Sequence, residues 1–160
     1  DAQESRGLGD VYKRQLIIFG ADDVSDARRA VEVTLANLDR TFGDVWGNDA
    51  GHLEFQYTAR ASFALEMAFG APLGKSFGIT VGAPSPIGLI MADTAVKTSN
   101  VDIVSYATPT SGQSFSNEVT MGISGDSGAV RQAIVAAREV GRQLLGALGA
   151  EPASTKEPYI

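Results

Sequence analysis

Residues 87–106 read IGLIMADTAVKTSNVDIVSY, and residues 118–148 read EVTMGISGDSGAVRQAIVAAREVGRQLLGAL. The first stretch predicts a helix over Pro86–Ser99, because its apolar residues recur every three or four positions, and then a strand over Val101–Tyr106. The second stretch predicts a strand over Glu118–Ile123 and a long amphipathic helix that ends near Leu148. Helix, strand, strand and helix in this order are typical of helices layered on a small sheet, so we expect an α+β fold, an α/β sandwich.

The rest of the chain shows the same alternation of strands and helices. We expect strands at Leu16–Phe19, Leu53–Thr58 and Phe77–Val81, and helices at Ala27–Phe42 and Ala59–Phe69. Acidic residues at Asp22, Asp23 and Asp26 suit the positive end of the first helix better than a metal site. The segment Asp44–Gly51 is rich in turn residues and predicts a connector.

An internal repeat links the two ends of this pattern. A strand, acidic residues and a long helix occur in residues 16–42 and again in residues 119–148. With an offset of 103 residues, Asp23 aligns with Asp126, Arg28 with Arg131 and Ala30 with Ala133. Two copies of one module explain this similarity, with only the last part of the first copy present.

The composition excludes several classes of function. The net charge of −6 and the lack of a basic cluster argue against partners that are nucleic acids or anionic membranes. The chain has no cysteine, so we expect no disulfide and no thiolate metal site. It has one histidine, His52, and no set of ligands that predicts a metal or a cofactor.

Residues 78–148 resemble the shell domain of bacterial microcompartments, the BMC fold. The resemblance rests on D-x-x-x-K-x-x-x-V at Asp93, Lys97 and Val101, on the small-residue loop TPTSG at 108–112, and on GDSGAV at 125–130. The preceding strand and helix resemble the circularly permuted, tandem-domain members of this family. The resemblance implies a ferredoxin-like antiparallel sheet with helices on one face, in a permuted tandem repeat.

The resemblance also implies a function. Such proteins form homotrimers in which six domains make a pseudohexameric tile, and they assemble with other shell proteins around encapsulated enzymes in the cytoplasm. Their pores pass small polar metabolites, in compartments that use propanediol, glycerol or ethanol. A protein of this kind is a structural shell protein without a cofactor, and we do not expect an enzyme.

The resemblance divides the chain and assigns candidate residues. Residues 1–15 form a non-native leader, because SRGLGDVYKRQ at 5–15 resembles a translated sequencing adapter. Residues 16–50 are the C-terminal remnant of a first BMC domain, 51–150 are a second domain, and 151–160 are a tail. Lys97 and Asn100 match the tile edge, where the alternative is a solvated lysine. The candidates for the pore loop are Thr110, Ser111, Gly112, Gln113 and Ser114, where the alternative is an ordinary surface loop.

The sequence is also compatible with two other classes of function. A small-molecule-binding regulatory domain of ferredoxin-like build has the same layers of helices and sheet. A hydrolase would use Ser127, because Gly125–Gly128 reads GDSG, as in trypsin-like proteases. That chemistry needs a histidine base and an acid beside the serine, and nothing in the sequence places His52 there.

Overall fold

The computed structural model describes residues 18–41, 43–110 and 117–154, without the side chains of 39–41. The chain divides into two units, Asp1–Phe42 and Gly43–Ile160. The leader expected at residues 1–15 lies outside the described residues. Among the helices of the described part, none combines the length and the apolar character that a membrane span requires.

The first unit contains helix α2, Val24–Thr41, which confirms the helix expected at Ala27–Phe42. Asp23 caps its start, since Oδ1 of Asp23 accepts hydrogen bonds from the backbone N and the Oγ of Ser25 at 2.8 and 2.7 Å. These bonds lower the pKa of Asp23. Ile18 and Phe19 belong to no strand, so the strand expected there is wrong for these two described residues.

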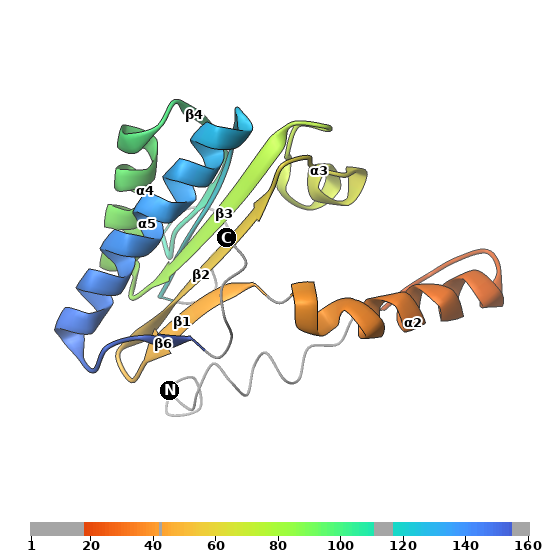
Figure 1. Cartoon of the computed structure of the whole chain (residues 1–160), viewed down its shortest axis with the longest axis horizontal. Coiled ribbons are helices and arrows are strands. Elements are labelled where there is room, and N and C mark those ends of the chain that lie inside the picture. The colour runs from red at the N-terminus through yellow and green to blue at the C-terminus, as the bar shows by residue number, and fades with distance from the viewer. Residues whose placement is uncertain (1–17, 42, 111–116, 155–160) are drawn as a thin grey trace. The chain divides into compact units, whose positions relative to one another are not determined.

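The second unit is built on one antiparallel sheet (Figure 1). Its strands are β1 (Asp44–Asn48), β2 (Gly51–Thr58), β3 (Ser76–Ala83), β4 (Val101–Ala107), β5 (Val119–Gly125) and β6 (Ala153–Ser154). The order across the sheet is β4-β5-β3-β2-β1-β6, and every neighbouring pair is antiparallel. The strands expected from the sequence at β2, β3, β4 and β5 are therefore confirmed, each within three residues at either end.

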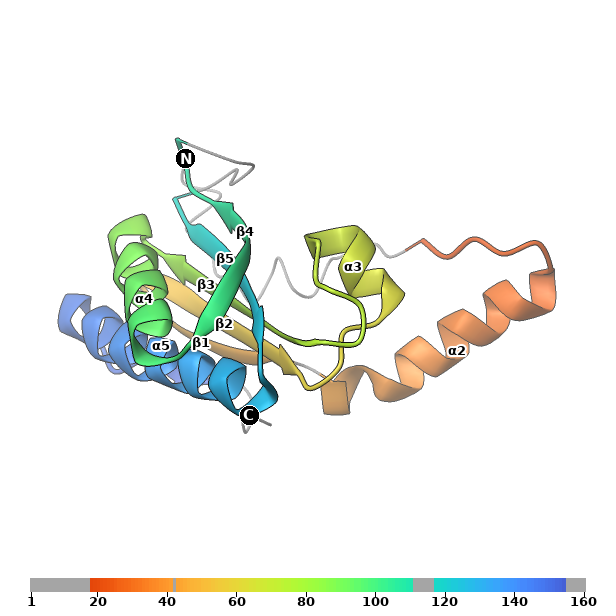
Figure 2. The same cartoon turned by 90° about the horizontal axis from the view of Figure 1, so that it is seen from above.

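Two long helices, α4 (Ser85–Thr98) and α5 (Ser127–Leu148), cover one face of this sheet (Figures 1 and 2). Their apolar stripes bury Met91 and Ile134 against Leu53, Phe55 and other strand residues in a single core. The α+β fold expected from the sequence is confirmed. A short helix, α3 (Phe63–Phe69), covers part of the other face, where Phe69 stacks on Phe77 at 5.8 Å.

One close approach fixes how α4 lies on the sheet. A Cβ atom on Gly82 of β3 would lie 2.7 Å from the Cα of Gly88 in α4, and a Cβ on Gly88 would lie 2.6 Å from the carbonyl oxygen of Gly82. Both contacts are with backbone, which cannot move aside as a flexible side chain can. Only glycine at both positions allows the helix to lie this close to the strand.

The connector expected at Asp44–Gly51 is wrong for most of its length. Residues Asp44–Asn48 form β1, which pairs with β2 through a tight turn at 49–50. The contacts divide the chain after Phe42, so β1 belongs with the second unit, whereas we expected the boundary after residue 50. In the tail, Ala153 and Ser154 form the short strand β6 beside β1.

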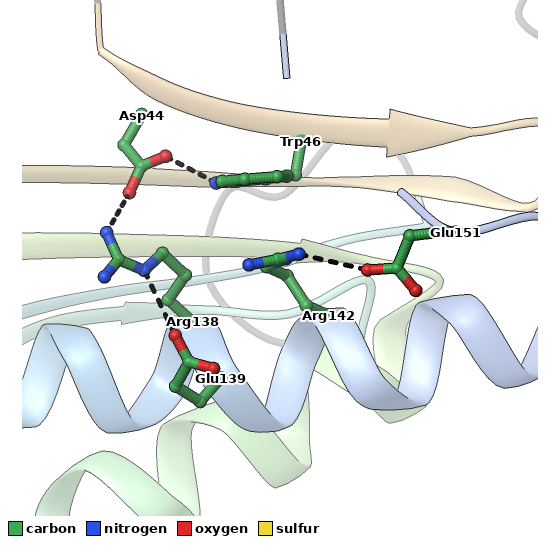
Figure 3. Close-up of polar contacts among 6 residues, drawn as sticks. All are labelled: Asp44, Trp46, Arg138, Glu139, Arg142 and Glu151. Atoms are coloured by element: carbon green, nitrogen blue, oxygen red, sulfur yellow. Dashed lines mark hydrogen bonds and ion pairs between the residues drawn. The ribbon is translucent and has the colours of Figure 1, made fainter. Parts of the chain in front are cut away.

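A polar network fastens β1 to α5 (Figure 3). Asp44 is fully buried, and its carboxylate accepts hydrogen bonds from Nε1 of Trp46 at 2.5 Å and from Arg138 at 2.8 Å. The guanidinium of Arg142 lies 3.9 Å from the centre of the Trp46 ring and also pairs with Glu151 at 3.0 Å. This network thus attaches both β1 and the start of the tail to one face of α5.

Candidate functional site

The two residues expected at a tile edge lie at the end of α4 and just after it. Lys97 is in the last turn of the helix, and Asn100 stands in the link to β4; both are exposed. Nζ of Lys97 donates a hydrogen bond to Asp93 at 2.6 Å, one turn earlier on the helix. An i,i+4 pair between side chains that are 73% and 57% exposed adds little stability, so Lys97 is available for contacts with a partner.

The pore-loop candidates follow β4 at its other end. Thr110 is exposed in a turn, and Ser111, Gly112, Gln113 and Ser114 lie outside the described residues. The described end of the loop is fixed to the start of α4, because the side-chain oxygen of Asn117 accepts hydrogen bonds from the backbone N and the Oγ of Ser85 at 3.3 and 2.8 Å.

Strand β4 separates these two groups of candidates. It has seven residues, so its ends lie about 20 Å apart at the usual rise of a strand. A register shift between Ile103 and Ser105 adds a local irregularity. The structure therefore does not bring Lys97 and Asn100 together with Thr110, and two separate surfaces result.

A third polar group lies on the face of the sheet away from α4 and α5. Leu53 and Phe55 point into the core beneath α5, so the alternating residues His52 and Glu54 point to the opposite face. Nε2 of His52 lies 3.6 Å from Glu54 Oε1 and 3.4 Å from Glu118 Oε2. The three side chains are 12%, 26% and 27% exposed, respectively.

The described members of this cluster are two carboxyl groups and one imidazole. Burial, and to a lesser extent the nearby carboxylate of Glu118, raise the pKa of Glu54 to about 7. The cluster is not a metal site, because no group of three or more His, Cys, Asp or Glu in the described residues has the arrangement that a metal ion requires.

The structure gives no support to a hydrolase at Ser127. The hydroxyl of Ser127 meets Oη of Tyr57 at the start of α5, on the helix side of the sheet. His52 lies on the other side of the sheet with Glu54 and Glu118. The histidine is therefore not placed to act as a base for Ser127.

Sequence reasoning missed both polar groups that the fold brings together. The alternation in residues 53–58 placed Glu54 opposite the core face, but nothing in the sequence linked it to Glu118, which is 64 residues away. Asp44 and Arg138, 94 residues apart, were missed for the same reason. The sequence contained only two signals for this pair: Asp44, an acid in a predicted connector, and Arg138, an arginine among the apolar residues of a predicted helix.

Comparisons with known proteins identify the domain. Residues 76–151 match the family model of the BMC domain. The shell protein PduB of Citrobacter freundii is 60% identical over 145 residues, which are 91% of this chain and 54% of that protein. The PduB of Limosilactobacillus reuteri is 53% identical over 91% of this chain and 61% of its own length. The chain thus spans little more than half the length of these relatives.

Solved structures agree with the sequence relatives. A trimeric bacterial microcompartment shell protein PduB superposes with a TM-score of 0.83 at 52% identity, over 88% of this chain and 62% of that one. EtuB from Clostridium kluyveri gives the same values. EutL from Clostridium perfringens, at 22% identity and a TM-score of 0.63, shares the fold. Residues 76–151 of the chain are therefore a BMC domain, and the chain as a whole is similar to the bacterial microcompartment shell proteins PduB and EtuB.

Proposed function

We propose that this chain is part of a structural tile of a bacterial microcompartment shell in the cytoplasm, which assembles as a homotrimer and then with other shell proteins. The observation that carries the proposal is the similarity to PduB, 60% identical over 91% of the chain, together with a fold that superposes on a trimeric PduB at a TM-score of 0.83. A role as a wall component needs no catalytic group, and we propose no enzymatic activity and no cofactor.

Helix α2 supports a first BMC domain upstream of the one seen here. Its large apolar side chains Val31, Leu35 and Leu38 are between 41% and 64% exposed in the described structure. With the offset of 103 residues, Ala30 and Val31 take the places of Ala133 and Ile134, which α5 buries against its sheet. We therefore propose that α2 covers the sheet of a first domain in the same way, so that residues 16 to about 42 are its remnant.

The two surfaces at the ends of β4 fit the two tasks of a tile. Lys97 and Asn100 are exposed at one end, where the long stem of a lysine can lie across a neighbour while its ammonium meets carbonyl oxygens. At the other end, the loop that contains Thr110–Ser114 consists mostly of small residues. Its hydroxyl and amide groups suit the passage of small polar metabolites. Neutral polar groups select such solutes without holding them tightly.

Assembly of the intact protein tests the proposal. We expect native mass spectrometry to show a trimer and electron microscopy to show flat sheets or shells. Lys97→Ala should keep the trimer and the folding temperature, because its ion pair is exposed, but should reduce the yield of sheets severalfold.

Arg131→Ala serves as the matched control, since Arg131 is an exposed cation on α5 outside the predicted edge. A protein that stays monomeric at high concentration and forms no sheets would contradict the tile. If that monomer bound a metabolite tightly and saturably, the regulatory-domain alternative would replace it.

A further inference from the structure

The two sides of the sheet are protected against further strand pairing in different ways. Strand β4 forms one outer edge, where Asp102 is exposed and a register shift between Ile103 and Ser105 interrupts the ladder. Charges and irregularities on an edge strand are common means of preventing another strand from pairing there. Strand β1, at the opposite side, reads VWG between its end residues, without a charge, and its register with β2 is regular.

The outer side of β1 is covered by the segment that follows α5. We call residues 150–154 the strap; its last two residues form β6 and pair with Gly47 and Trp46 of β1. A strand of two residues makes few ladder hydrogen bonds, and each contributes only about 1 kcal/mol. The strap therefore depends on other contacts for its position on the sheet.

One side-chain amide connects the strap to both α5 and the β1–β2 turn. Nδ2 of Asn48, the last residue of β1, donates hydrogen bonds to the carbonyl oxygens of Leu145 at 3.0 Å and Ala150 at 2.7 Å. Oδ1 of Asn48 accepts a hydrogen bond from the backbone N of Ala50 at 2.9 Å. The carbonyl groups in the last turn of a helix have no partner within the helix. Asn48 thus supplies one at Leu145 and holds the first residue of the strap against β1.

A buried proline holds the middle of the strap. Pro152 is fully buried, and a Cβ atom on Gly146 of α5 would lie 3.4 Å from Cδ of Pro152. Proline has no backbone N–H, so its burial leaves no donor without a partner. Glu151 pairs with Arg142 at 3.0 Å, but its side chain is 75% exposed and the pair adds little. Asn48 and Pro152 therefore provide most of the attachment.

We propose that the strap, held by Asn48, covers the outer side of β1 so that this strand does not pair with β1 of a second copy. Without the strap, β1 would present unpaired N–H and C=O groups on a short strand that lacks a charge between its ends. A second β1 is a suitable occupant, because two such edges can pair antiparallel about a twofold axis and extend both sheets. The inference does not depend on the tile function, since it follows from one edge of the sheet.

Hydrogen exchange in the intact protein tests the role of Asn48. Asn48→Asp keeps the size of the side chain, but a carboxylate cannot donate hydrogen bonds to the two carbonyl oxygens. We expect the amides of residues 151–154 to lose protection by about tenfold, while those of α4 keep theirs. Gln143→Glu is the matched control, because it makes the same change from amide to carboxylate at an exposed position near the end of α5, and it should leave the strap protected.

Native mass spectrometry over a range of concentrations tests the role of the covered edge. Asn48→Asp should add species larger than the wild-type assembly, in amounts that rise with concentration. Adding Val45→Lys should remove these species without restoring the protection of the strap, because a lysine on an edge strand opposes pairing. Val45 is the register partner of Glu54, whose carboxylate suits a neighbouring ammonium. Pro152→Ser loosens the strap without changing Asn48 and should give the same larger species.

The proposal is overturned if Asn48→Asp keeps the wild-type protection of residues 151–154, or if it loses that protection and forms no larger species. It is also overturned if Val45→Lys leaves the larger species in place, since another surface would then cause the association. An equal loss of protection in Gln143→Glu overturns it as well, because charge at the helix end would explain the effect. Should Asn48→Asp fail to fold, Pro152→Ser with and without Val45→Lys decides by the same criteria.

Discussion

Two polar clusters lie on opposite faces of the sheet and handle buried charge in different ways. On the helix side, Asp44 is fully buried and balanced by the guanidinium of Arg138 at 2.8 Å. On the open side, Glu54 and Glu118 share the ring of His52. Both clusters join segments that are far apart in the sequence, but among their described members only the first contains a guanidinium.

The difference teaches which partner a buried acid requires. An arginine keeps its charge at any physiological pH, so Arg138 supplies the Asp44 carboxylate with a permanent positive charge between β1 and α5. A carboxylate that has no such partner and is partly buried takes up a proton instead, as the pKa of about 7 for Glu54 indicates. The first cluster therefore contains its own counter-charge, whereas the raised pKa of Glu54 makes the second sensitive to pH.

The largest effect on stability is expected from a substitution of Asp44. Asp44→Asn should lower the free energy of unfolding by about 3 kcal/mol, because it removes the buried carboxylate that meets the Arg138 guanidinium at 2.8 Å, whereas the other acid, Glu139, is 3.7 Å away and 55% exposed. Chemical denaturation followed by circular dichroism measures the loss. The double variant Asp44→Leu with Arg138→Met should recover most of it. A double variant as unstable as the single one would show that shape, and not charge, makes the attachment.

A smaller effect is expected at Arg142, which stacks on Trp46 at 3.9 Å. Arg142→Met keeps an unbranched side chain on the ring and removes the charge, so the protein should lose about 1 kcal/mol, the usual range of a partly desolvated cation–π contact. Trp46 is the single tryptophan of the chain, so its fluorescence should shift as well. Arg131→Met, exposed on the same helix, should change neither; an equal loss there would assign the effect to helix propensity.

The smallest effect should come from the exposed pair in α4. Asp93→Asn removes the partner of Lys97, and we expect less than about 0.5 kcal/mol, because exposed i,i+4 pairs are screened by solvent and salt. The free energy of unfolding is measured in the same way as for Asp44→Asn. The difference between the two losses then gives the effect of burial on a carboxylate–cation pair. A loss near 3 kcal/mol would mean that the pair is covered in the assembled protein.

Much of the fold was predictable because local periodicity carries it. The stripe of α5 from Val130 to Leu145 and the alternation of β2 follow from the spacing of apolar residues, and both elements are confirmed. The resemblance to the BMC domain was confirmed by the match over 76–151. The roles of Lys97, Asn100 and Thr110–Ser114 stay predictions.

The predictions that failed concern segments whose structure depends on pairing with distant strands and not on the local spacing of apolar residues. Residues 44–48 read DVWGN, which lacks alternating apolar residues. They form β1 because they pair with β2 and because Arg138 donates a hydrogen bond to the carboxylate of Asp44. Conversely, Ile18 and Phe19 look like a strand and form none in the described unit, since an apolar run without a neighbouring strand has no ladder to join. The polar clusters were invisible for the same reason: their members meet only through the register of the sheet.

The contact between Gly82 and Gly88 sets a limit for anyone who redesigns such a domain. Each residue is already the smallest that exists, so an enlargement at one position has no compensating reduction at the other. In a library that randomises both positions, the pair should return as glycine nearly every time, whereas the exposed positions of α4 accept wide variation. Tags or new contact residues are best introduced on the exposed side of α4, with the seam between this helix and β3 left as it is.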